Sequence, residues 1–96
     1  MNVSFLPGAL DDYVEARMWY AEQSRRAAAA FEAAVDVGVK KIAADPERFP
    51  SCDDCHRFHI LKRFPFSLVF RVSSNGVLIV AVAHSSREQS YWKSRG

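Results

Sequence analysis

Apolar and polar side chains alternate along residues 66–84, and a turn signal, Asn75-Gly76, interrupts the alternation. A period of two predicts β-strands, and Asn-Gly between two such runs favours a two-residue hairpin turn. With this pair at the centre of the turn, the numbers of facing residues sum to 151, so Phe70 should face Ala81. One face would then be wholly apolar: Leu68, Phe70, Val72, Ile79, Ala81 and Ala83. The other would carry the polar groups among valines: Ser67, Val69, Arg71, Val80, Val82 and His84.

A third strand is predicted over residues 56–62, where Phe58 and Ile60 alternate with other side chains. If the connection to the hairpin is odd in length, these two residues join the apolar face of the sheet. The second face then gathers most of the polar candidates for function: Arg57, His59, Ser67, Arg71 and His84.

Upstream, apolar residues recur every three or four positions, which predicts two helices. The first runs from Ala9 to about Gln23 and should bury Leu10, Tyr13, Val14, Met18 and Ala21. The second begins after Ser24, a favourable N-cap, and ends before Pro46. Its buried stripe should contain Phe31, Val35, Val39 and Ile42.

A short strand at residues 2–5, closed by Pro7-Gly8, completes the pattern. The elements predict an α+β fold of two layers, in which an antiparallel sheet (β-α-α-β-β-β) is covered on one face by a helical hairpin from residues 9–45. A length of 96 residues suits one domain, residues 1–96.

The net charge of +2 conceals an uneven distribution. Residues 1–55 carry six Lys/Arg against ten Asp/Glu, a net −4, whereas residues 56–96 carry seven Lys/Arg against one Glu, a net +6. The basic half is the predicted sheet, so an acidic partner and a merely solvated basic face both fit. No run approaches the roughly 18 apolar residues that span a bilayer, and the first residues do not resemble a signal peptide. We therefore expect a cytoplasmic protein with no membrane partner.

The segment Cys52-Asp53-Asp54-Cys55-His56 has the spacing of a haem-attachment motif, and with His59 it offers four potential zinc ligands. Haem attachment requires export, and the two histidines would point to opposite faces of one strand. We therefore expect a reduced polar loop, with no disulfide, no metal and no cofactor.

Several short motifs follow one another along nearly the whole chain: Ala9-Leu10-Asp11-Asp12, Trp19-Tyr20, Phe31, Ile42, Asp45-Pro46-Glu47-Arg48-Phe49-Pro50, Arg63-Phe64-Pro65-Phe66, Val82-Ala83-His84, Arg87 and Tyr91-Trp92-Lys93-Ser94-Arg95. Their order resembles the RelE/ParE superfamily of bacterial toxins from type II toxin–antitoxin systems, and ParE-like members in particular. Two positions depart from that pattern. The proline usual after Arg87 is absent, and Phe66 stands where tyrosine is common.

The resemblance implies two alternative modes of toxicity. A ParE-like toxin is not an enzyme but binds and poisons DNA gyrase, and the residues expected to contact this target are Arg57, His59, Arg71, Arg87, Tyr91, Trp92 and Arg95. A RelE-like toxin is a metal-independent endoribonuclease that cuts ribosome-bound mRNA, and its catalytic groups here would be His84, Arg87 and Tyr91. The moderate net charge and the whole-chain match favour the ParE-like mode. A third alternative is a non-toxic structural or binding domain.

Some of these residues also have a purely structural interpretation. A histidine at the end of a strand, such as His84, commonly bonds to the following segment, and Arg87 and Arg95 can order the tail against the acidic first helix. The partner that the resemblance implies is a cognate antitoxin, in a toxin–antitoxin hetero-oligomer. Its candidate anchoring sites are Met18, Trp19 and Tyr20, unless at least two of these belong to the core.

Overall fold

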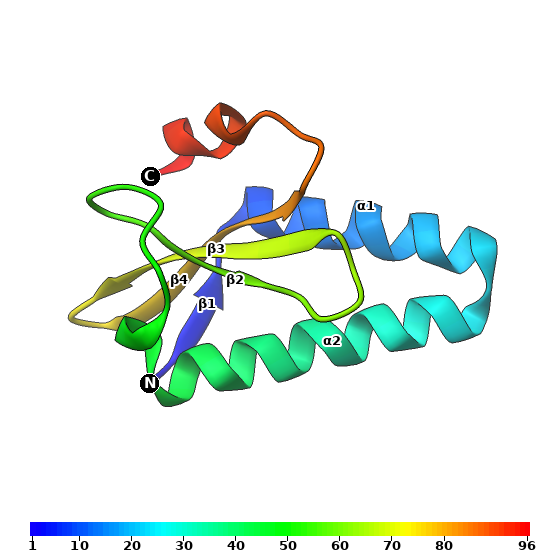
Figure 1. Ribbon diagram of the computed structural model, residues 1–96, viewed down its shortest axis with the longest axis horizontal. Coiled ribbons are helices and arrows are strands. Elements are labelled where there is room, and N and C mark those ends of the chain that lie inside the picture. Colours follow the sequence, from blue (N-terminus) through cyan, green and yellow to red (C-terminus); the bar gives the residue numbers. More distant parts are fainter.

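The computed structural model describes all 96 residues and confirms the two-layer α+β fold. Four strands, two long helices and two short 3-10 helices follow one another along the chain (Figure 1). They are β1 (Val3–Phe5), α1 (Pro7–Gln23), α2 (Arg25–Ala44), η1 (Pro46–Arg48), β2 (Arg57–Ile60), β3 (Phe66–Ser73), β4 (Gly76–His84) and η2 (Gln89–Arg95). No helix combines the length and the apolar character that a membrane crossing requires.

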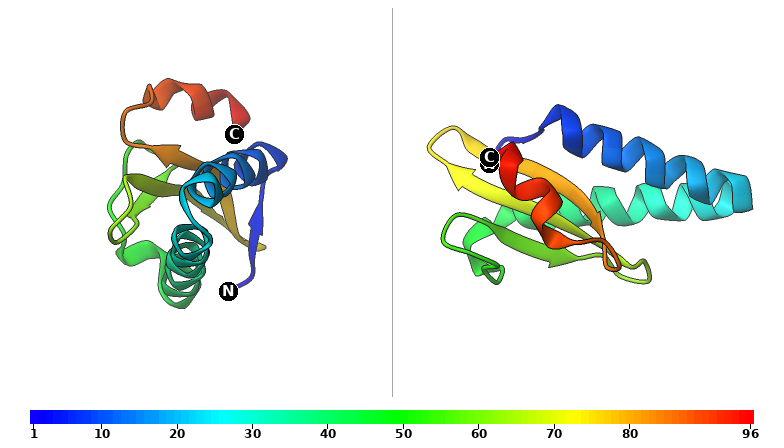
Figure 2. Two further views of the ribbon diagram at one scale, coloured as in Figure 1. Left: turned by 90° about the vertical axis from the view of Figure 1, so that its right-hand side faces the viewer. Right: turned by 90° about the horizontal axis from the view of Figure 1, so that it is seen from above.

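The strands form one sheet in the order β1-β4-β3-β2. β2, β3 and β4 are antiparallel neighbours, as predicted, and β1 pairs with β4 in parallel orientation. The hairpin of α1 and α2 lies against one face of the sheet, and η2 returns over the other (Figure 2). A large apolar core therefore fills the helix side, and a smaller cluster lies under the tail.

The turn between β3 and β4 comes one residue earlier than the Asn-Gly signal predicts. Ser73 pairs with Gly76, so the turn residues are Ser74 and Asn75, neither of which has a positive φ. Gly76 has a φ of 130°, and a Cβ there would lie 2.4 Å from the carbonyl oxygen of Asn2. The glycine therefore allows β1 to approach β4 closely, and the predicted pairing sum of 151 is wrong.

A β-bulge in β4 changes the register a second time. Phe70 pairs with Ile79, not Ala81, while Val69 pairs with Ala81, which leaves Val80 without a partner on β3. An extra residue of this kind reverses the alternation of side chains beyond it. Val80 and Ala81 consequently belong to the same small cluster under the tail.

The bulge exchanges the faces predicted for the end of β4. Val82 joins the main core on the helix side, and the ring of His84 lies edge-on against Phe66 with centroids 5.0 Å apart. Ala81 and Ala83, predicted for the helix side, belong to the cluster under the tail. His84 is therefore on the α1 side of the sheet and does not share the tail face with Arg71.

The faces predicted for β2 are exchanged as well. Arg57 pairs with Phe70 and His59 with Leu68, so these two polar residues lie on the helix side. The hydrogen bond that closes the connection runs from the backbone N–H of Leu61 to the carbonyl of Phe66, which leaves an even number of residues between them. With an even number of connecting residues, each side chain of β2 lies on the opposite face of the sheet from the one expected with an odd number. The residues predicted for the helix-facing core lie on the opposite face: Phe58 and Ile60.

The second helix follows its prediction closely. The Ser24 hydroxyl accepts a hydrogen bond from the Ala27 backbone N–H at 2.9 Å, as expected of an N-cap. Phe31, Val35 and Ile42 are buried against the sheet.

In α1, by contrast, the predicted stripe is largely wrong. Ala9 and Ala16 are buried, whereas Leu10, Val14 and Met18 are 49%, 51% and 59% exposed. Small side chains at the contact let α1 lie close to β4, and this proximity excludes the larger apolar residues from that face. Of the predicted stripe, Tyr13 packs against the core, on Phe31, while Leu10, Val14 and Met18 lie on the outer surface of the molecule.

Candidate functional site

The Asp12 carboxylate, on α1, anchors the C-terminal tail. Its side chain is only 7% exposed, and Oδ2 accepts hydrogen bonds from Arg95 Nη1 at 2.8 Å, Tyr91 Oη at 3.3 Å and the Val82 backbone N–H at 3.1 Å. Arg95 Nη1 also donates to the Val80 carbonyl at 3.1 Å. A buried carboxylate is stable only when such donors compensate its lost hydration. The anchor thus joins α1, the bulge of β4 and η2.

The charges of this anchor alter the protonation of its neighbours. The hydrogen bond to Asp12 raises the pKa of Arg95. Burial, followed by the negative charge of Asp12, raises the pKa of Tyr91 to about 12. The Tyr91 phenol is therefore protonated, and a donor, at neutral pH.

The raised pKa of Tyr91 predicts a late step in a spectrophotometric titration. The folded protein holds the Tyr91 proton more tightly than the unfolded chain does. The contribution of this phenol to the free energy of unfolding is therefore complete below pH 10 and is lost between about pH 10 and pH 12. Ultraviolet absorbance should show phenolate forming last at Tyr91, and Tyr91→Phe should remove that last step. An unchanged titration of the variant would contradict the assignment.

Arg87 lies over the outer side of the same anchor. Its Cζ is 3.7 Å from the centroid of the Tyr91 ring, and its Nη1 is 4.0 Å from Asp12 Oδ1. The side chain is nevertheless 52% exposed. Arg87 is therefore held in place by a cation–π contact while still offering its guanidinium to a partner.

Trp92, expected at the target surface, lies inside the molecule. It is 2% exposed, packs in the cluster with Val69, Val80 and Ala81, and meets the ring of His56 at a centroid distance of 4.9 Å. In this structure the packing of Trp92 fixes the tail against the sheet.

His84 is held by the segment that follows it. Its Nδ1 accepts a hydrogen bond from the Ser86 backbone N–H at 3.0 Å and lies 2.8 Å from the Ser86 hydroxyl. The structural interpretation of this residue therefore describes its geometry well. Its ring also lines a groove shared with Arg87.

The remaining basic candidates are divided between the two faces of the sheet. Arg57 Nη1 donates to the Phe49 carbonyl at 2.6 Å, and His59 packs edge-on against the Phe49 ring. Burial, with the charges of Lys41 and Arg48, lowers the pKa of His59. Arg71 belongs to the opposite face, where its Nε is buried without a hydrogen-bond partner. The expected single basic face therefore does not form.

The cysteine loop forms a hydrogen-bonded turn around Asp53. This carboxylate accepts from the backbone N–H groups of Cys55 at 2.8 Å and His56 at 2.7 Å, and it lies 2.9 Å from His56 Nδ1. Cys52 and Cys55 are free thiols. No three His, Cys, Asp or Glu side chains of the chain are grouped to hold a metal ion.

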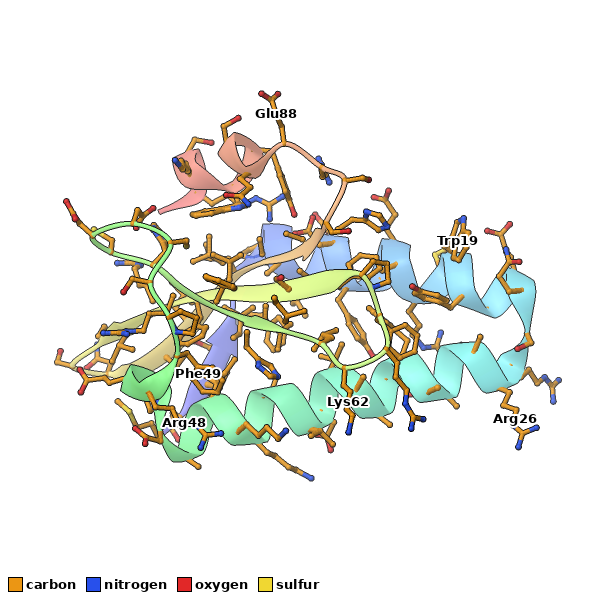
Figure 3. The ribbon with its side chains drawn as sticks, in the orientation of Figure 1. Trp19, Arg26, Arg48, Phe49, Lys62 and Glu88 are labelled. Atoms are coloured by element: carbon orange, nitrogen blue, oxygen red, sulfur yellow. The ribbon has the colours of Figure 1, made fainter.

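A groove of about 640 Å³ runs between α1 and the end of β4. Trp19 and Met18, 57% and 59% exposed, form its outer rim, and Trp19 projects from α1 away from α2 (Figure 3). Of the candidate antitoxin anchors, only Tyr20 packs into the aromatic core, against Phe31 and Phe64. The groove is lined by Asp12, Glu15, Ala16, Met18, Trp19, Tyr20, Glu22, Pro65, Phe66, Val82, His84 and Arg87.

Three acidic residues of this groove were not predicted as site residues: Asp12, Glu15 and Glu22. A signal for them exists, because together with Trp19 they recur at intervals of three and four residues and so share one face of α1. Acidic residues near the start of a helix are also explained by their favourable interaction with the helix macrodipole, so such residues do not by themselves indicate an acidic binding face.

The chain matches a family model described as the ParE toxin of the type II toxin–antitoxin system parDE, over residues 3–89. Its fold is similar to a solved structure titled "Chromosomal ParDE TA system from P. aeruginosa", with a TM-score of 0.75 and 22% sequence identity. That match covers 88% of this chain and 95% of the other. No curated protein matches the chain.

Proposed function

Because the chain belongs to the ParE toxin family of type II toxin–antitoxin systems, we propose that it arrests bacterial growth by binding DNA gyrase and that a cognate antitoxin restrains it. The family relationship supports a toxin. The choice of gyrase follows from the resemblance to ParE-like toxins, and the choice of binding over RNA cleavage rests on the arrangement of the tail.

The preference for binding over RNA cleavage is supported by the hydrogen bonds that hold the candidate catalytic groups to their own chain. Tyr91, with a pKa of about 12, donates to Asp12, and His84 Nδ1 accepts from Ser86. A pKa this far above neutral pH makes the Tyr91 phenol a poor general base, and His84 has one of its two ring nitrogens bonded within its own chain. A firmly held tail with an exposed arginine is better suited to binding an acidic surface.

The proposed contact surface is the outer side of the tail. Arg87 contributes a half-exposed guanidinium, while Tyr91, Trp92 and Arg95 hold the backbone that carries it. Arg71 lies on the same side of the sheet. Arg57 and His59 lie on the helix side and do not belong to this surface.

Induced expression tests the proposal in cells. We expect growth to stop, replication to stall and the DNA-damage response to begin, while bulk mRNA remains intact. Purified protein should trap gyrase on cleaved DNA, and Arg87→Ala should weaken this by about 10- to 30-fold, the effect of losing one binding hot spot. Arg26→Ala, at the far end of the helical hairpin, is the matched control (Figure 3). Equal activity of both variants would contradict the proposed surface.

A second candidate function is ribosome-dependent cleavage of mRNA, because His84 and Arg87 line the same groove. In that case translation should fail first, with cuts at ribosome-bound codons. His84→Ala should then lower the cleavage rate by about 10²- to 10⁴-fold, the usual contribution of a proton-transfer group. A chain that stops neither replication nor translation at full expression would be a non-toxic binding domain.

A further inference from the structure

We propose that Cys52 and Cys55 are a site of reversible oxidation, at which hydrogen peroxide converts the two thiols to a disulfide and thereby loosens the C-terminal tail from the sheet. Both thiols are free and exposed in the structure. Reversible disulfides of this kind occur in reducing compartments as sensors of oxidants. The effect on the tail is independent of the target of the toxin, and only its consequence for gyrase rests on the proposed function.

The cysteine loop is a narrow hairpin that holds both thiols on one turn. The backbone N–H of Cys52 donates to the carbonyl of His56 at 2.9 Å, and Ser51 pairs with Arg57 in antiparallel orientation. Cys55 belongs to the turn that this bond closes. A disulfide requires Cα atoms within about 7 Å of each other, and a chain that reverses within so few residues reaches this range by local movement.

The surroundings of the two thiols differ, which indicates the order in which they react. Cys52 Sγ donates to the His56 carbonyl at 3.5 Å, and burial, followed by the charge of Asp53, raises the pKa of this thiol. The Cys55 thiol makes no hydrogen bond and lines a hollow of about 180 Å³ that the cysteine loop shares with η1 and β2. Cys55 is therefore the thiol that an oxidant reaches first, and Cys52 completes the disulfide.

The charges of this hollow determine which oxidant fits. Three carboxylates, Glu47, Asp53 and Asp54, line it against one guanidinium, Arg57. Glutathione disulfide is an anion and is repelled by such a surface, whereas hydrogen peroxide is neutral and small. The oxidant that the hollow admits best is therefore a small neutral peroxide.

The reaction takes two steps and releases two molecules of water. The Cys55 thiolate attacks one oxygen of hydrogen peroxide, the O–O bond breaks, and the departing hydroxide takes up the proton that Cys55 had released, which leaves a sulfenic acid on Cys55. Cys52 Sγ then attacks the sulfur of this group. The S–S bond forms as the S–O bond breaks, and hydroxide leaves with the proton of Cys52. Two electrons pass from the thiols to the peroxide, and a thiol reductant reverses the change by exchange.

His56 couples the cysteine loop to the tail. The Asp53 carboxylate accepts hydrogen bonds from the backbone N–H groups of Cys55 and His56 and lies 2.9 Å from His56 Nδ1. The His56 side chain is buried, and its ring meets that of Trp92 at a centroid distance of 4.9 Å. Formation of the disulfide turns Cys52 Sγ away from the His56 carbonyl and pulls on the residue next to His56. The oxidised loop therefore displaces the ring that supports Trp92.

Peroxide treatment of the purified chain tests the site and its coupling to the tail. The titratable thiols should fall from two to none, with a loss of two hydrogens from the mass of one chain. In a Trp19→Phe background, which leaves Trp92 as the one tryptophan, fluorescence should shift to longer wavelength. Limited proteolysis after residue 84 should accelerate by about 10-fold, because a segment that opens more often is cut faster. Dithiothreitol should reverse each change, whereas oxidised methionine would persist.

Single variants test the order of the two steps. Cys52→Ser should stop at the sulfenic acid on Cys55, which dimedone traps, and Cys55→Ser should react with dimedone about 10-fold less. The control is Cys52→Ser/Cys55→Ser, whose tail should respond to peroxide neither in fluorescence nor in proteolysis. With purified gyrase, oxidised wild type should inhibit about 10-fold less than its reduced form, while the double variant should inhibit equally in both conditions.

The inference is overturned by two thiols that survive peroxide, by a disulfide that joins two chains, or by an internal disulfide that leaves Trp92 fluorescence and tail proteolysis unchanged. An equal response of wild type and double variant would overturn it as well, because the effect would then come from another residue. If the reduced wild type does not act on gyrase while its tail responds to oxidation as expected, the proposed target fails and the oxidation site stands.

Discussion

Replacing Asp12 by alanine is expected to release the C-terminal tail, to lower the free energy of unfolding by about 3 kcal/mol and to abolish growth arrest. The carboxylate is 7% exposed and accepts hydrogen bonds from Arg95, Tyr91 and the backbone of Val82. Without it, the guanidinium and the phenol lose their acceptor, and the Val82 N–H remains unpaired beside the bulge.

The expected loss is at the lower end of the range for a broken buried ion pair. Arg95 is 23% exposed in its side chain, so part of its charge can return to water once Asp12 is gone. Urea unfolding measures the change in stability, and limited proteolysis after residue 84 measures release of the tail.

Asp11→Ala is the control, because this neighbour is exposed and makes no ion pair or side-chain hydrogen bond in the structure. It should change stability by less than about 0.5 kcal/mol. In a double-mutant cycle with Arg95→Ala, the two losses should be clearly non-additive. Additive losses would show that Asp12 stabilises the fold in some way other than through Arg95.

The register of β4 shows where sequence patterns stop being informative. Asn75-Gly76 is a strong turn signal, yet the glycine is needed for the approach of β1, a contact with Asn2 more than 70 residues away. The bulge at Val80 has no marker of its own, because neither glycine nor proline is present there. Its backbone is instead supported by Arg95 at the Val80 carbonyl and by Asp12 at the Val82 N–H. Alternation alone cannot predict a register that the distant tail helps to set.

The second helix of the hairpin was more predictable because its determinants are local. Ser24 caps α2 through a hydrogen bond three residues away, and the buried stripe of α2 follows helical spacing. The sequence predicted that Arg95 can order the tail against the acidic first helix, and the structure identifies Asp12 as its partner. That the carboxylate would also support the sheet backbone could not be predicted, because the bond from Val82 spans 70 positions in sequence.

Replacing Trp92 by alanine should have the largest effect on stability, about 3–5 kcal/mol, because it empties the centre of the cluster beneath the tail. Trp92 is 2% exposed and packs against Val69, Val80 and Ala81, all of them nearly inaccessible. The cavity cannot close easily, since these partners belong to the central strands of the sheet. His56 would also lose the aromatic ring against which it packs.

Trp19→Ala provides a control of identical chemistry at an exposed position. Trp19 is 57% exposed, so its removal should cost far less, within about 1 kcal/mol. Urea unfolding of both variants measures the difference, and induced expression measures its consequence. We expect Trp92→Ala to lose growth arrest even at temperatures where its helices remain folded, because the segment that carries Arg87 is no longer seated on the sheet. If Trp92→Ala stayed fully toxic with a displaced tail, the surface that inhibits growth would have to lie elsewhere on the protein.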